Sequence, residues 1–521
     1  MSNLFSIIGF ILEFLAYLLI LRYNLHMFQL NGYKNNEQIS WLKKNWRNQS
    51  ILLVLLFVGI LAAVIDFWLT DVVLYVVLLL MLLFYRFLKK SKNKKKLVFT
   101  NRVKRLICTQ TLLMIIGLAL LCWCLSVDRA WHYFCVLLFL QPCLILFSNL
   151  LNKPIEKGVN QHFINDAKRK LKAVQDLKII GITGSYGKTS VKYFLYTLLQ
   201  SKYDVLITPE SYNTPMGIVK TIRESLKPTH EYFICEMGAR YVGDIKEICD
   251  IVHPMYGVIT SIGPQHLQTF GSLDHIIKTK FELADALPKD GTIFLNGDDM
   301  NIRGKSNEYE NPIFFQTGTD LKGYRAEDIT YSQVGTEFTI VTPKGETQKF
   351  QMRLIGGHNV IDVTCAIAVA NSLGISLPEL KVPVRRLQPV EHRMQMRQSS
   401  AVTIIDDAYN SNPVGSKAAV ETLAMFDGIK ILVTPGMVEL GAEEEKFNYE
   451  FGKYAANCCD YILLIGRKHT EAIAKGVMDE GFSKDKCQVF ERLEDAMTYA
   501  YAIKGEGHKY ILLENDLPDN Y

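Results

Sequence analysis

The sequence predicts an α-helical transmembrane region followed by two α/β domains. Five apolar stretches fill the first 150 residues, strand and helix patterns alternate from about residue 177 onward, and a glycine-rich loop follows the first of those strands. We therefore divide the chain into a transmembrane region (1–150), a linker or membrane-surface helix (151–176), a central domain (177–386) and a C-terminal domain (387–521).

Charge is distributed unevenly along the 521-residue chain. Residues 1–150 carry 16 Lys and Arg against 5 Asp and Glu, whereas the remainder carries 42 against 48. Because a nucleic-acid-binding protein concentrates basic residues on its folded domains, this pattern indicates membrane topology, and we expect no nucleic-acid partner. The hydrophobic content of 49% is that of a folded chain with several domains.

The five apolar stretches each approach the roughly 20 residues that an α-helix needs to cross about 30 Å of hydrocarbon. The first lacks the basic n-region and the small-residue cleavage site of a signal peptide. Only a short turn separates the second from the third, and a count of four spans would reverse the side on which residue 151 emerges. The stretches lie near 4–21, 50–68, 70–88, 106–125 and 131–150.

The loops between these stretches alternate in charge. The loop at 22–49 holds five basic residues, and the loop at 86–105 contains the run KKSKNKKK, whereas the turns at 66–71 and 126–130 are short and mainly acidic. Basic loops stay in the cytoplasm, so five spans place the N-terminus outside the cell membrane and residue 151 inside. The α/β domains are then cytoplasmic, where ATP is available, and the spans contact membrane lipids.

Two further features have competing interpretations. The 11 cysteines include no C-x-x-C pair and no cluster with histidine, so we expect buried reduced thiols rather than zinc sites or disulfides. Glu13, in the first apolar stretch, is either a functional intramembrane acid or a residue that faces a neighbouring helix.

The stretch GITGSYGKTS (181–190) follows the apolar strand pattern DLKII and precedes a helical pattern. It lacks the full eight-residue phosphate-loop template but retains G-x-x-G-K-T from Gly184. Backbone N–H groups can then surround phosphate oxygens, Lys188 supplies positive charge, and the Thr189 hydroxyl can hold Mg²⁺. These residues predict a site for the triphosphate of ATP, at the start of a helix expected to begin at Ser190. The expected cradle comprises Gly184, Ser185, Gly187, Lys188, Thr189 and Ser190.

Seven further motifs follow the phosphate loop along the chain. They are NTPMGI (213–218), EMGA (236–239), GPQHLQTFGS (263–272), KTKFE (278–282), GGHNVIDVTCAIAVA (356–370), PVEHRM (389–394) and DDAYNSNP (406–413). These eight motifs, in this order over about 177–521, resemble those of the Mur ligases, and they are most similar to the branch that adds D-alanyl-D-alanine to a UDP-muramoyl tripeptide. The resemblance implies a phosphate-loop central domain, a Rossmann-like C-terminal domain and a role in peptidoglycan synthesis for the cell wall.

The resemblance also implies catalytic and metal-binding residues. Activation of a carboxylate as an acyl phosphate requires metal and charge neutralisation around the transferred phosphoryl group. Glu236 and His266 are expected at strand ends beside the phosphate loop, where they could hold Mg²⁺ together with Thr189. Two magnesium sites are expected in all. Lys188, His266 and Lys280 are the expected catalytic residues.

Two assignments have a neighbouring alternative. Lys280 is expected to be carbamylated, which turns a cation that would repel Mg²⁺ into an anion that helps to hold it, and the rival position is Lys278. Asp407 is expected at a ribose hydroxyl, with Asp406 beside it and helix capping as the competing interpretation of both. The other expected contacts are His358 and Asn359 at the adenine, Arg393 at the phosphates, and Asn213, Thr214, Tyr409, Asn410 and Asn412 at the substrate.

The N-terminal region departs from the family pattern. Mur ligases carry a soluble N-terminal domain that grips the UDP-sugar end of the acceptor, whereas this chain has apolar stretches there. The acceptor is therefore expected to be either the soluble cell-wall precursor or a lipid-linked one presented at the membrane. Tyr186 in the phosphate loop is also bulkier than the family pattern leads us to expect.

We expect an ATP-dependent ligase that joins an acceptor carboxylate to an amino acid or a dipeptide. A Mur-like ligase for another peptide or a polyglutamate-type product is the alternative within this class. A non-catalytic nucleotide-binding membrane scaffold is a second class, disfavoured because the expected site residues are all present. An ATP-driven transporter would need a second ATPase signature and polar residues through the spans, and we find neither.

Overall fold

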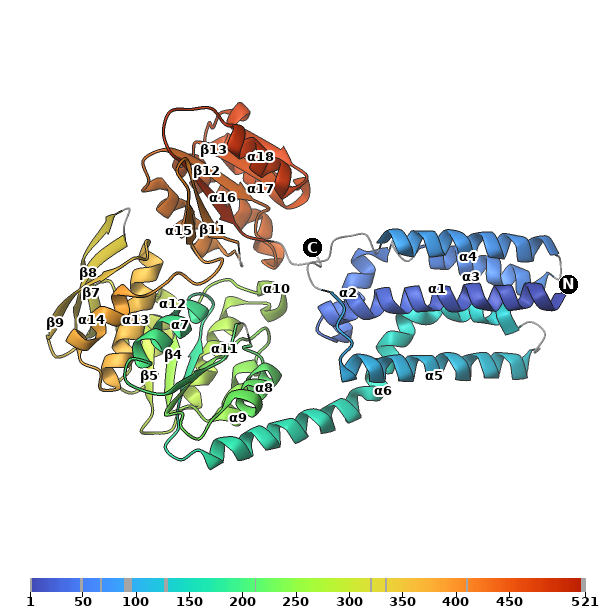
Figure 1. Cartoon of the computed structure of the whole chain (residues 1–521), viewed down its shortest axis with the longest axis horizontal. Coiled ribbons are helices and arrows are strands. Elements are labelled where there is room, and N and C mark those ends of the chain that lie inside the picture. The colour runs from blue at the N-terminus through green and yellow to red at the C-terminus, as the bar shows by residue number, and fades with distance from the viewer. Residues whose placement is uncertain are drawn as a thin grey trace. The chain divides into compact units, whose positions relative to one another are not determined.

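The chain forms two compact units (Figure 1), one built from residues 1–161 and the other from residues 162–517. Over the described residues, the first unit contains only helices and the second contains two sheets with their covering helices. The computed structural model describes residues 2–46, 50–65, 68–88, 96–125, 130–210, 212–318, 321–332, 335–408 and 411–516.

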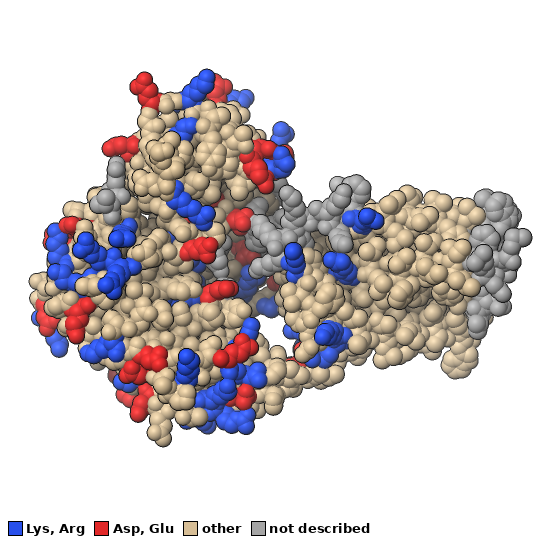
Figure 2. Space-filling view, in the orientation of Figure 1, with Lys and Arg blue, Asp and Glu red and all other residues tan. Residues whose placement is uncertain are grey.

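The helical unit has an apolar surface over most of its described residues. Phe57, Val64 and Trp123 are 69%, 73% and 84% exposed, and Figure 2 shows few charged residues over much of the visible face of this unit. Such a surface suits hydrocarbon better than water. The helices that begin in this unit are α1 (Ser2–Leu30), α2 (Asn35–Lys44), α3 (Ser50–Val64), α4 (Trp68–Leu88), α5 (Asn101–Cys124) and α6 (Ala130–Ala173).

Within the part of the chain that the structure describes, three of these helices are long and apolar enough to cross a membrane. Their segments are Ile7–Leu30, Asn101–Cys124 and His132–Ala173, while Leu52–Leu61 and Val72–Arg86 are shorter apolar helical segments. Each of the five predicted stretches therefore falls on a helix, and in three of them the described residues include an apolar segment long enough for a full span. Most of the basic run and parts of both acidic turns, on which the predicted orientation depends, lie outside the described residues.

Two helices run further than the apolar patterns indicate. α1 continues to Leu30, and α6 passes position 150 without the break that we expected between a span and a linker. Pro142 and Pro154 lie inside α6. Each removes one backbone hydrogen bond, but helix-forming residues on both sides continue the helix. Residues 151–173 are thus part of one long helix and not a separate element.

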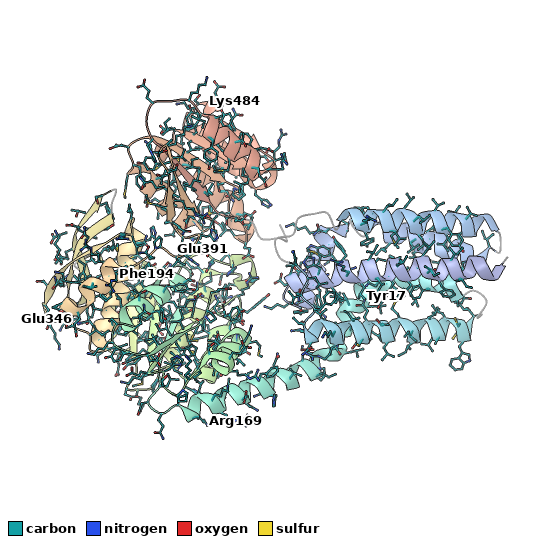
Figure 3. All side chains as sticks on the ribbon, in the orientation of Figure 1. Tyr17, Arg169, Phe194, Glu346, Glu391 and Lys484 are labelled. Carbon is teal, nitrogen blue, oxygen red and sulfur yellow. The ribbon has the colours of Figure 1, made fainter. Side chains whose placement is uncertain are left out.

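Polar side chains are buried between the helices of this unit. The Asn24 amide donates to Gln141 Oε1 at 3.0 Å, and the Cys135 thiol donates to Glu13 at 2.8 Å. Tyr17 also lies between the helices (Figure 3). Hydrogen bonds of this kind fix the register of apolar helices. The prediction that the spans lack polar residues is therefore wrong, and Glu13 faces a neighbouring helix, as the second of its two interpretations proposed.

The end of α6 belongs to the second unit, which we call the α/β unit. Arg223 Nε pairs with Asp166 Oδ2 at 2.7 Å, and the Arg223 guanidinium lies 4.3 Å from the centroid of the Phe163 ring. Ala167 is fully buried in the same cluster. This part of the segment predicted as a linker or membrane-surface helix is therefore packed against the helix that carries Arg223.

The larger sheet of the α/β unit has nine strands in the order β2-β3-β1-β4-β5-β6-β7-β8-β9. Neighbours from β2 to β7 are parallel, and β7, β8 and β9 pair antiparallel. The chain moves from β1 toward one edge and from β4 toward the other, so the strand order reverses between them. Ligands of open parallel sheets bind beyond the carboxyl ends of strands at such a point. The strands are β1 (Lys178–Thr183), β2 (Val205–Ile207), β3 (Tyr232–Glu236), β4 (Tyr256–Ile259), β5 (Thr292–Asn296), β6 (Ile313–Gln316), β7 (Gly323–Ser332), β8 (Gly335–Val341) and β9 (Thr347–Met352).

The smaller sheet has six strands in the order β10-β11-β15-β12-β13-β14. Only β10 runs antiparallel to its neighbour, so this sheet is also a mainly parallel one with its carboxyl ends along one edge. The predicted α/β character of the C-terminal part is confirmed. The strands are β10 (Gln395–Gln398), β11 (Val402–Asp407), β12 (Ile429–Thr434), β13 (Tyr461–Ile465), β14 (Cys487–Phe490) and β15 (Lys509–Glu514).

Helices cover both sheets and complete the core. α7 packs against α13, and Phe194 on α7 is 2% exposed inside the largest apolar cluster (Figure 3). This packing fixes α7 at the end of β1. The helices are α7 (Lys188–Leu199), α8 (Pro215–Ser225), α9 (Asp244–Val252), α10 (Leu267–Phe270), α11 (Leu273–Asp285), α12 (Met300–Ser306), α13 (Gly357–Ser372), α14 (Leu377–Arg385), α15 (Pro413–Ala424), η3 (Gly441–Glu443), α16 (Glu444–Cys458), α17 (Arg467–Asp479), η4 (Lys484–Lys486) and α18 (Leu493–Ala502).

Candidate active site

The glycine-rich loop connects β1 to α7 at the point where the strand order reverses. Gly184 has a φ of +150° and Gly187 a φ of +79°, in the region that favours glycine. A Cβ on Gly184 would lie 2.1 Å from Thr260 Oγ1, so the loop cannot accept a side chain there. α7 begins at Lys188, two residues earlier than predicted. The N-terminal N–H groups of the helix therefore lie directly at the loop.

The loop is anchored to the residues that follow β4. The Ser185 N–H donates to the Ser261 carbonyl at 2.7 Å, and Ser185 Oγ lies 3.0 Å from both the N and the O of Gly263. A Cβ on Gly263 would lie 2.7 Å from the Tyr186 ring, so the bulky Tyr186 fills the space that this glycine leaves. The unusual side chain thus packs beside the loop as part of its support.

Lys188 folds back over the loop that precedes it. Its ammonium donates to the carbonyl of Gly184 at 2.7 Å and to that of Ser185 at 3.0 Å. Burial of the ammonium lowers the pKa of Lys188 to about 8, with Glu236 opposing this shift and Arg393 adding to it. An anion bound beside this amine would raise its pKa again, so that Lys188 would be fully protonated.

Glu236, at the end of β3, is the centre of the site. Its side chain is 2% exposed, and its Oε1 accepts hydrogen bonds from Thr189 Oγ1 at 3.2 Å and from Asn213 Nδ2 at 3.0 Å. Its Oε2 lies 2.9 Å from Lys192 Nζ in a fully buried ion pair. Burial opposes ionisation, but Lys192 and Lys188 outweigh it and hold the pKa of Glu236 below its ordinary value. The carboxylate is therefore charged at neutral pH.

Lys192 was not identified from the sequence. It lies one helical turn after Lys188, and its Nζ also donates to the Glu210 carbonyl at 2.5 Å. That carbonyl belongs to the segment that leads from β2 to Asn213. Its position four residues after Lys188 could have identified it, because this spacing places both lysines on one face of α7.

Lys280 and Lys278 differ in their surroundings. Lys280 is 2% exposed in α11, whereas Lys278 is exposed. Burial, followed by repulsion from Lys188, holds the pKa of Lys280 well below its ordinary value. A neutral amine is the form that reacts with carbon dioxide, so the geometry favours Lys280 over its rival as a modification site.

His266 precedes α10 and has a φ of +51°. Its Nδ1 lies 2.5 Å from Glu439 Oε2. Burial lowers the pKa of His266, although the bond to Glu439 acts in the opposite direction. Lys188 interacts electrostatically with Glu236, His266 and Lys280, so these three predicted residues surround one ammonium.

The residues expected around the nucleotide base and phosphates come from three segments. Arg393 Nη2 donates to Thr189 Oγ1 at 3.3 Å, so it reaches the phosphate loop. Asn359 is buried at the start of α13 and donates to the Ile355 carbonyl at 2.8 Å. His358 lies 3.0 Å from the Asn359 amide, and Ser190 is buried in the first turn of α7.

Asp362 is a second residue that was not identified from the sequence. It is buried in α13, and a Cβ on Gly187 would lie 2.6 Å from its Oδ1. Burial raises the pKa of Asp362 to about 8, with Arg393 opposing the shift. A carboxyl group that is mostly protonated at neutral pH can lie against a phosphate-binding loop without repelling phosphate.

The two aspartates at the end of β11 have different partners. Asp406 Oδ2 lies 2.9 Å from His392 Nδ1 and 3.2 Å from Arg397 Nη2. Asp407 Oδ1 accepts from the Met394 N–H at 3.1 Å, and burial raises the pKa of Asp407 although the hydrogen bonds from Met394 and Glu514 act in the opposite direction.

Neither aspartate caps α15, so that interpretation is wrong. The cap is Asn412, whose Oδ1 accepts from the N–H groups of Val414 and Gly415 at 3.1 and 2.7 Å. Thr214 likewise caps α8, accepting from the Gly217 N–H at 3.3 Å. Tyr409 and Asn410 lie outside the described residues.

The donor set suits magnesium better than a metal held by protein ligands alone. Among the described residues, no group of three or more His, Cys, Asp and Glu side chains is arranged to hold a metal ion. Mg²⁺ is commonly bound by one or two carboxylates together with substrate phosphates and water. The neighbouring oxygens of Thr189 and Glu236, beside a phosphate-binding loop, fit that pattern.

A phosphate loop at a reversal of strand order, with a buried carboxylate and three lysines beside it, defines a nucleotide-dependent α/β enzyme. The Mur ligase middle domain matches residues 182–370, and the Mur ligase glutamate ligase domain matches residues 392–513. The chain belongs to the Mur ligase family, whose members use ATP and Mg²⁺, and it is an ATP-dependent, ADP-forming ligase. Residues 1–181 lie outside both matched ranges.

Relatives and solved structures support the same membership. The UDP-N-acetylmuramoyl-tripeptide–D-alanyl-D-alanine ligase of Bacillus subtilis is 31% identical over 325 residues, which cover 61% of this chain and 69% of the relative. The enzyme of the same name from Escherichia coli is 28% identical over 361 residues, 66% of this chain and 78% of the relative. MurF of Thermotoga maritima, solved in complex with ADP, is 26% identical with a TM-score of 0.62 and covers 68% of this chain and 80% of that structure.

The Lys192–Glu236 pair generates a prediction about stability. Lys192→Met leaves a buried carboxylate without its nearest ammonium, so the free energy of unfolding should fall by about 3–5 kcal/mol at neutral pH. Because the pKa of Glu236 is lowered by folding, the stabilisation is present above about pH 4.3 and lost as the pH falls through the folded-state value. Denaturant titration of the nucleotide-free protein in detergent measures the change.

The double variant Lys192→Met/Glu236→Gln should recover most of this loss, because neither member of the pair then carries a charge. The exposed Lys220, 4.0 Å from Glu224 on α8, provides the control. Lys220→Met should change the free energy of unfolding by less than about 1 kcal/mol. A Lys192→Met protein as stable as the wild type would show that the pair does not stabilise the fold.

Proposed function

We propose that this Mur ligase joins a D-alanyl-D-alanine-like dipeptide to the peptide carboxylate of a muramoyl precursor at the cytoplasmic face of the cell membrane. The observation that carries the proposal is the placement of Thr189, Glu236 and Lys188 around one phosphate-binding loop. The named ligases from Escherichia coli and Bacillus subtilis support the dipeptide and the muramoyl acceptor.

The phosphate loop and its lysine bind the transferred group in this proposal. The N–H groups at the start of α7 and the ammonium of Lys188 hold the phosphates, and Arg393 reaches them from the C-terminal part. Thr189 and Glu236 would hold Mg²⁺. When bound, the metal neutralises the negative charge that otherwise repels an incoming carboxylate.

The reaction proceeds in two displacements. A carboxylate oxygen of the acceptor attacks the γ-phosphorus, the bond to the β-bridging oxygen breaks, and ADP leaves. The amine nitrogen then attacks the acyl carbon, and phosphate leaves as the amine loses a proton. The buried cationic groups around Glu236 stabilise the charge of the first transition state, while their burial excludes the water that would hydrolyse the acyl phosphate.

Lys280 completes the second metal site in this proposal. Its buried neutral amine forms an N–C bond with carbon dioxide and releases a proton, which gives a carbamate. The carbamate carries negative charge beside Lys188, where the unmodified cation would be repelled. Together with His266, it would hold the second Mg²⁺ near the acceptor carboxylate.

The remaining site residues orient the substrates. Asn359, with His358, contacts the adenine, and Asp407 contacts a ribose hydroxyl from the end of β11. Asn213 orients Glu236 and faces the acceptor from the segment between β2 and α8. Thr214 and Asn412 act through the helix starts that they cap, while the expected contacts of Tyr409 and Asn410 remain sequence-based predictions.

The helical unit anchors the enzyme in the membrane in this proposal. Three helices have the length and composition of a span, and the two shorter apolar segments complete the five predicted spans. With the N-terminus outside, the ligase part is cytoplasmic. A membrane-anchored ligase meets a lipid-linked precursor at the same bilayer, so that precursor is the acceptor form that we propose.

Lys188→Ala should abolish ligation and acceptor-dependent ADP release together, because the transferred phosphoryl group loses its nearest cation. A fall of more than about 10³-fold in kcat is expected. Coupled measurement of ADP and phosphate in detergent follows both products. Lys178, exposed at the opposite end of β1, is the control, and Lys178→Ala should retain wild-type rates. ADP release that persists in Lys188→Ala would remove the loop from the reaction.

Carbamylation predicts a ¹³C signal. Protein equilibrated with ¹³C-bicarbonate should show a carbamate resonance that disappears in Lys280→Ala and persists in Lys278→Ala. Ligase activity should fall in carbon dioxide-free buffer and return on addition of bicarbonate. A resonance that disappears with Lys278 would assign the modification to the exposed lysine instead.

The acceptor is tested with the full-length chain in detergent. The lipid-linked precursor should give a kcat/KM at least about tenfold above that of the soluble UDP-linked precursor, since anchoring by the helical unit raises its effective concentration. Equal or faster turnover of the soluble precursor would contradict the lipid-linked part of the proposal. Turnover of neither, with ADP release on other peptides, would favour the alternative peptide or polyglutamate-type ligase.

A further inference from the structure

Two side chains from separate sheets of the α/β unit meet beside the active site. His266 follows β4 of the larger sheet, and Glu439 follows β12 of the smaller one. Their side chains are 19% and 22% exposed, with 2.5 Å between Nδ1 and Oε2. α10, which starts after His266, also contacts η3, which starts two residues after Glu439. The contact is therefore part of the junction between the domain that contains the larger sheet and the domain that contains the smaller one.

The backbone at both partners is unusual. His266 has a φ of +51° and Glu439 a φ of +65°, in the left-handed region that residues other than glycine rarely adopt. Such conformations persist where the surroundings require them and are concentrated at functional sites. Here both of them aim a side chain at the same contact.

Glu439 has a second cationic neighbour. Arg240 Nη2 lies 3.8 Å from Glu439 Oε1, the carboxylate oxygen that does not bond to His266. The Glu439 carboxylate thus lies between a ring nitrogen and a guanidinium, and a neighbouring cation favours the charged form of a carboxyl group. A carboxylate can only accept hydrogen bonds, so the proton between the two residues belongs to Nδ1 of His266.

We propose that Glu439 is a positioning residue for the ligase reaction, which holds His266 in the tautomer with a proton on Nδ1 and a free lone pair on Nε2. The inference rests on the role proposed for His266 at the second metal. A carboxylate that accepts from the outer nitrogen of a metal-binding histidine fixes the ring and raises its basicity. Because Glu439 comes from the C-terminal part, His266 is ready to bind only when the two parts are docked.

This arrangement links catalysis to domain closure. The C-terminal part contributes Arg393 at the phosphate loop and Glu439 at His266, so two separate contacts bring it to the same site. Closure then both positions the incoming amine and prepares the histidine. Without the docked carboxylate, the ring loses the contact that orients it.

Mutational kinetics with a double-mutant cycle test the positioning role. Glu439→Ala should lower kcat/KM for ligation by about 10–100-fold, and Glu439→Gln, which keeps an acceptor oxygen, should lower it less. In a protein that already carries His266→Ala, the additional Glu439→Ala change should lower kcat/KM by less than about twofold, because Glu439 acts through the His266 ring. Losses that multiply in the double variant, or a single-variant loss below twofold, would overturn the proposal.

A matched carboxylate–histidine pair supplies the control. Glu444 Oε1 lies 3.1 Å from His469 Nδ1 between α16 and α17, entirely within the C-terminal part. Glu444→Gln should leave kcat/KM and the melting temperature unchanged. A comparable loss in this variant would show that charge removal on this surface acts generally and not through His266.

The tautomer gives a readout that does not depend on turnover. In protein labelled with ¹⁵N-histidine, the resonances that disappear in His266→Ala identify the ring, and the wild type should show a protonated Nδ1 with an unprotonated Nε2. Glu439→Ala should convert this pattern to a mixture of tautomers. An unchanged pattern would overturn the inference, whereas the expected change in a protein that releases no ADP would refute the proposed function alone.

Discussion

The active site depends on keeping one buried carboxylate charged. Glu236 is almost completely enclosed at the end of β3, where an isolated anion would be strongly disfavoured. Lys192, Lys188, Thr189 and Asn213 together offset that cost. These residues come from α7 and from the segment after β2, so both must be in place before the carboxylate is stable as an anion. The same arrangement presents an oxygen ligand beside the phosphate loop.

The sheet topology explains why these groups converge. Parallel strands place their carboxyl ends along one edge, and the strand order reverses between β1 and β4, where ligands of such sheets bind. The loop after β1, the end of β3 and the turn after β4 all lie at that edge, and the C-terminal part adds Arg393 and Glu439. A ligase that must exclude water during phosphoryl and acyl transfer is well served by a site completed by two domains.

The sequence patterns predicted the helices, strands and motifs better than they predicted the contacts between side chains. The phosphate loop and the α/β alternation followed from the residue patterns, and the placement of Glu236 beside Thr189 followed from the resemblance to the Mur ligases. The full length of α6 did not, since polar residues after position 150 resemble a linker although they continue the helix. Lys192, Asp362 and Glu439 were also missed, because each is an ordinary charged residue in sequence and gains its role only from partners far along the chain. Conversely, the choice of Lys280 over Lys278 agrees with the burial of Lys280. In a sequence, such burial is indicated only by the periodicity of apolar residues along the helix.

The central claim is that the residues around Glu236 hold the phosphates and magnesium of the nucleotide. A structure of the full-length protein with ADP and Mg²⁺, determined by cryo-electron microscopy, tests this claim most directly. We expect the β-phosphate within the loop from Gly184 to Thr189, with the metal about 2.0–2.1 Å from Thr189 Oγ1 and in contact with the Glu236 carboxylate. A nucleotide bound elsewhere, or a metal that contacts neither side chain while the Lys192–Glu236 pair stays intact, would contradict the account.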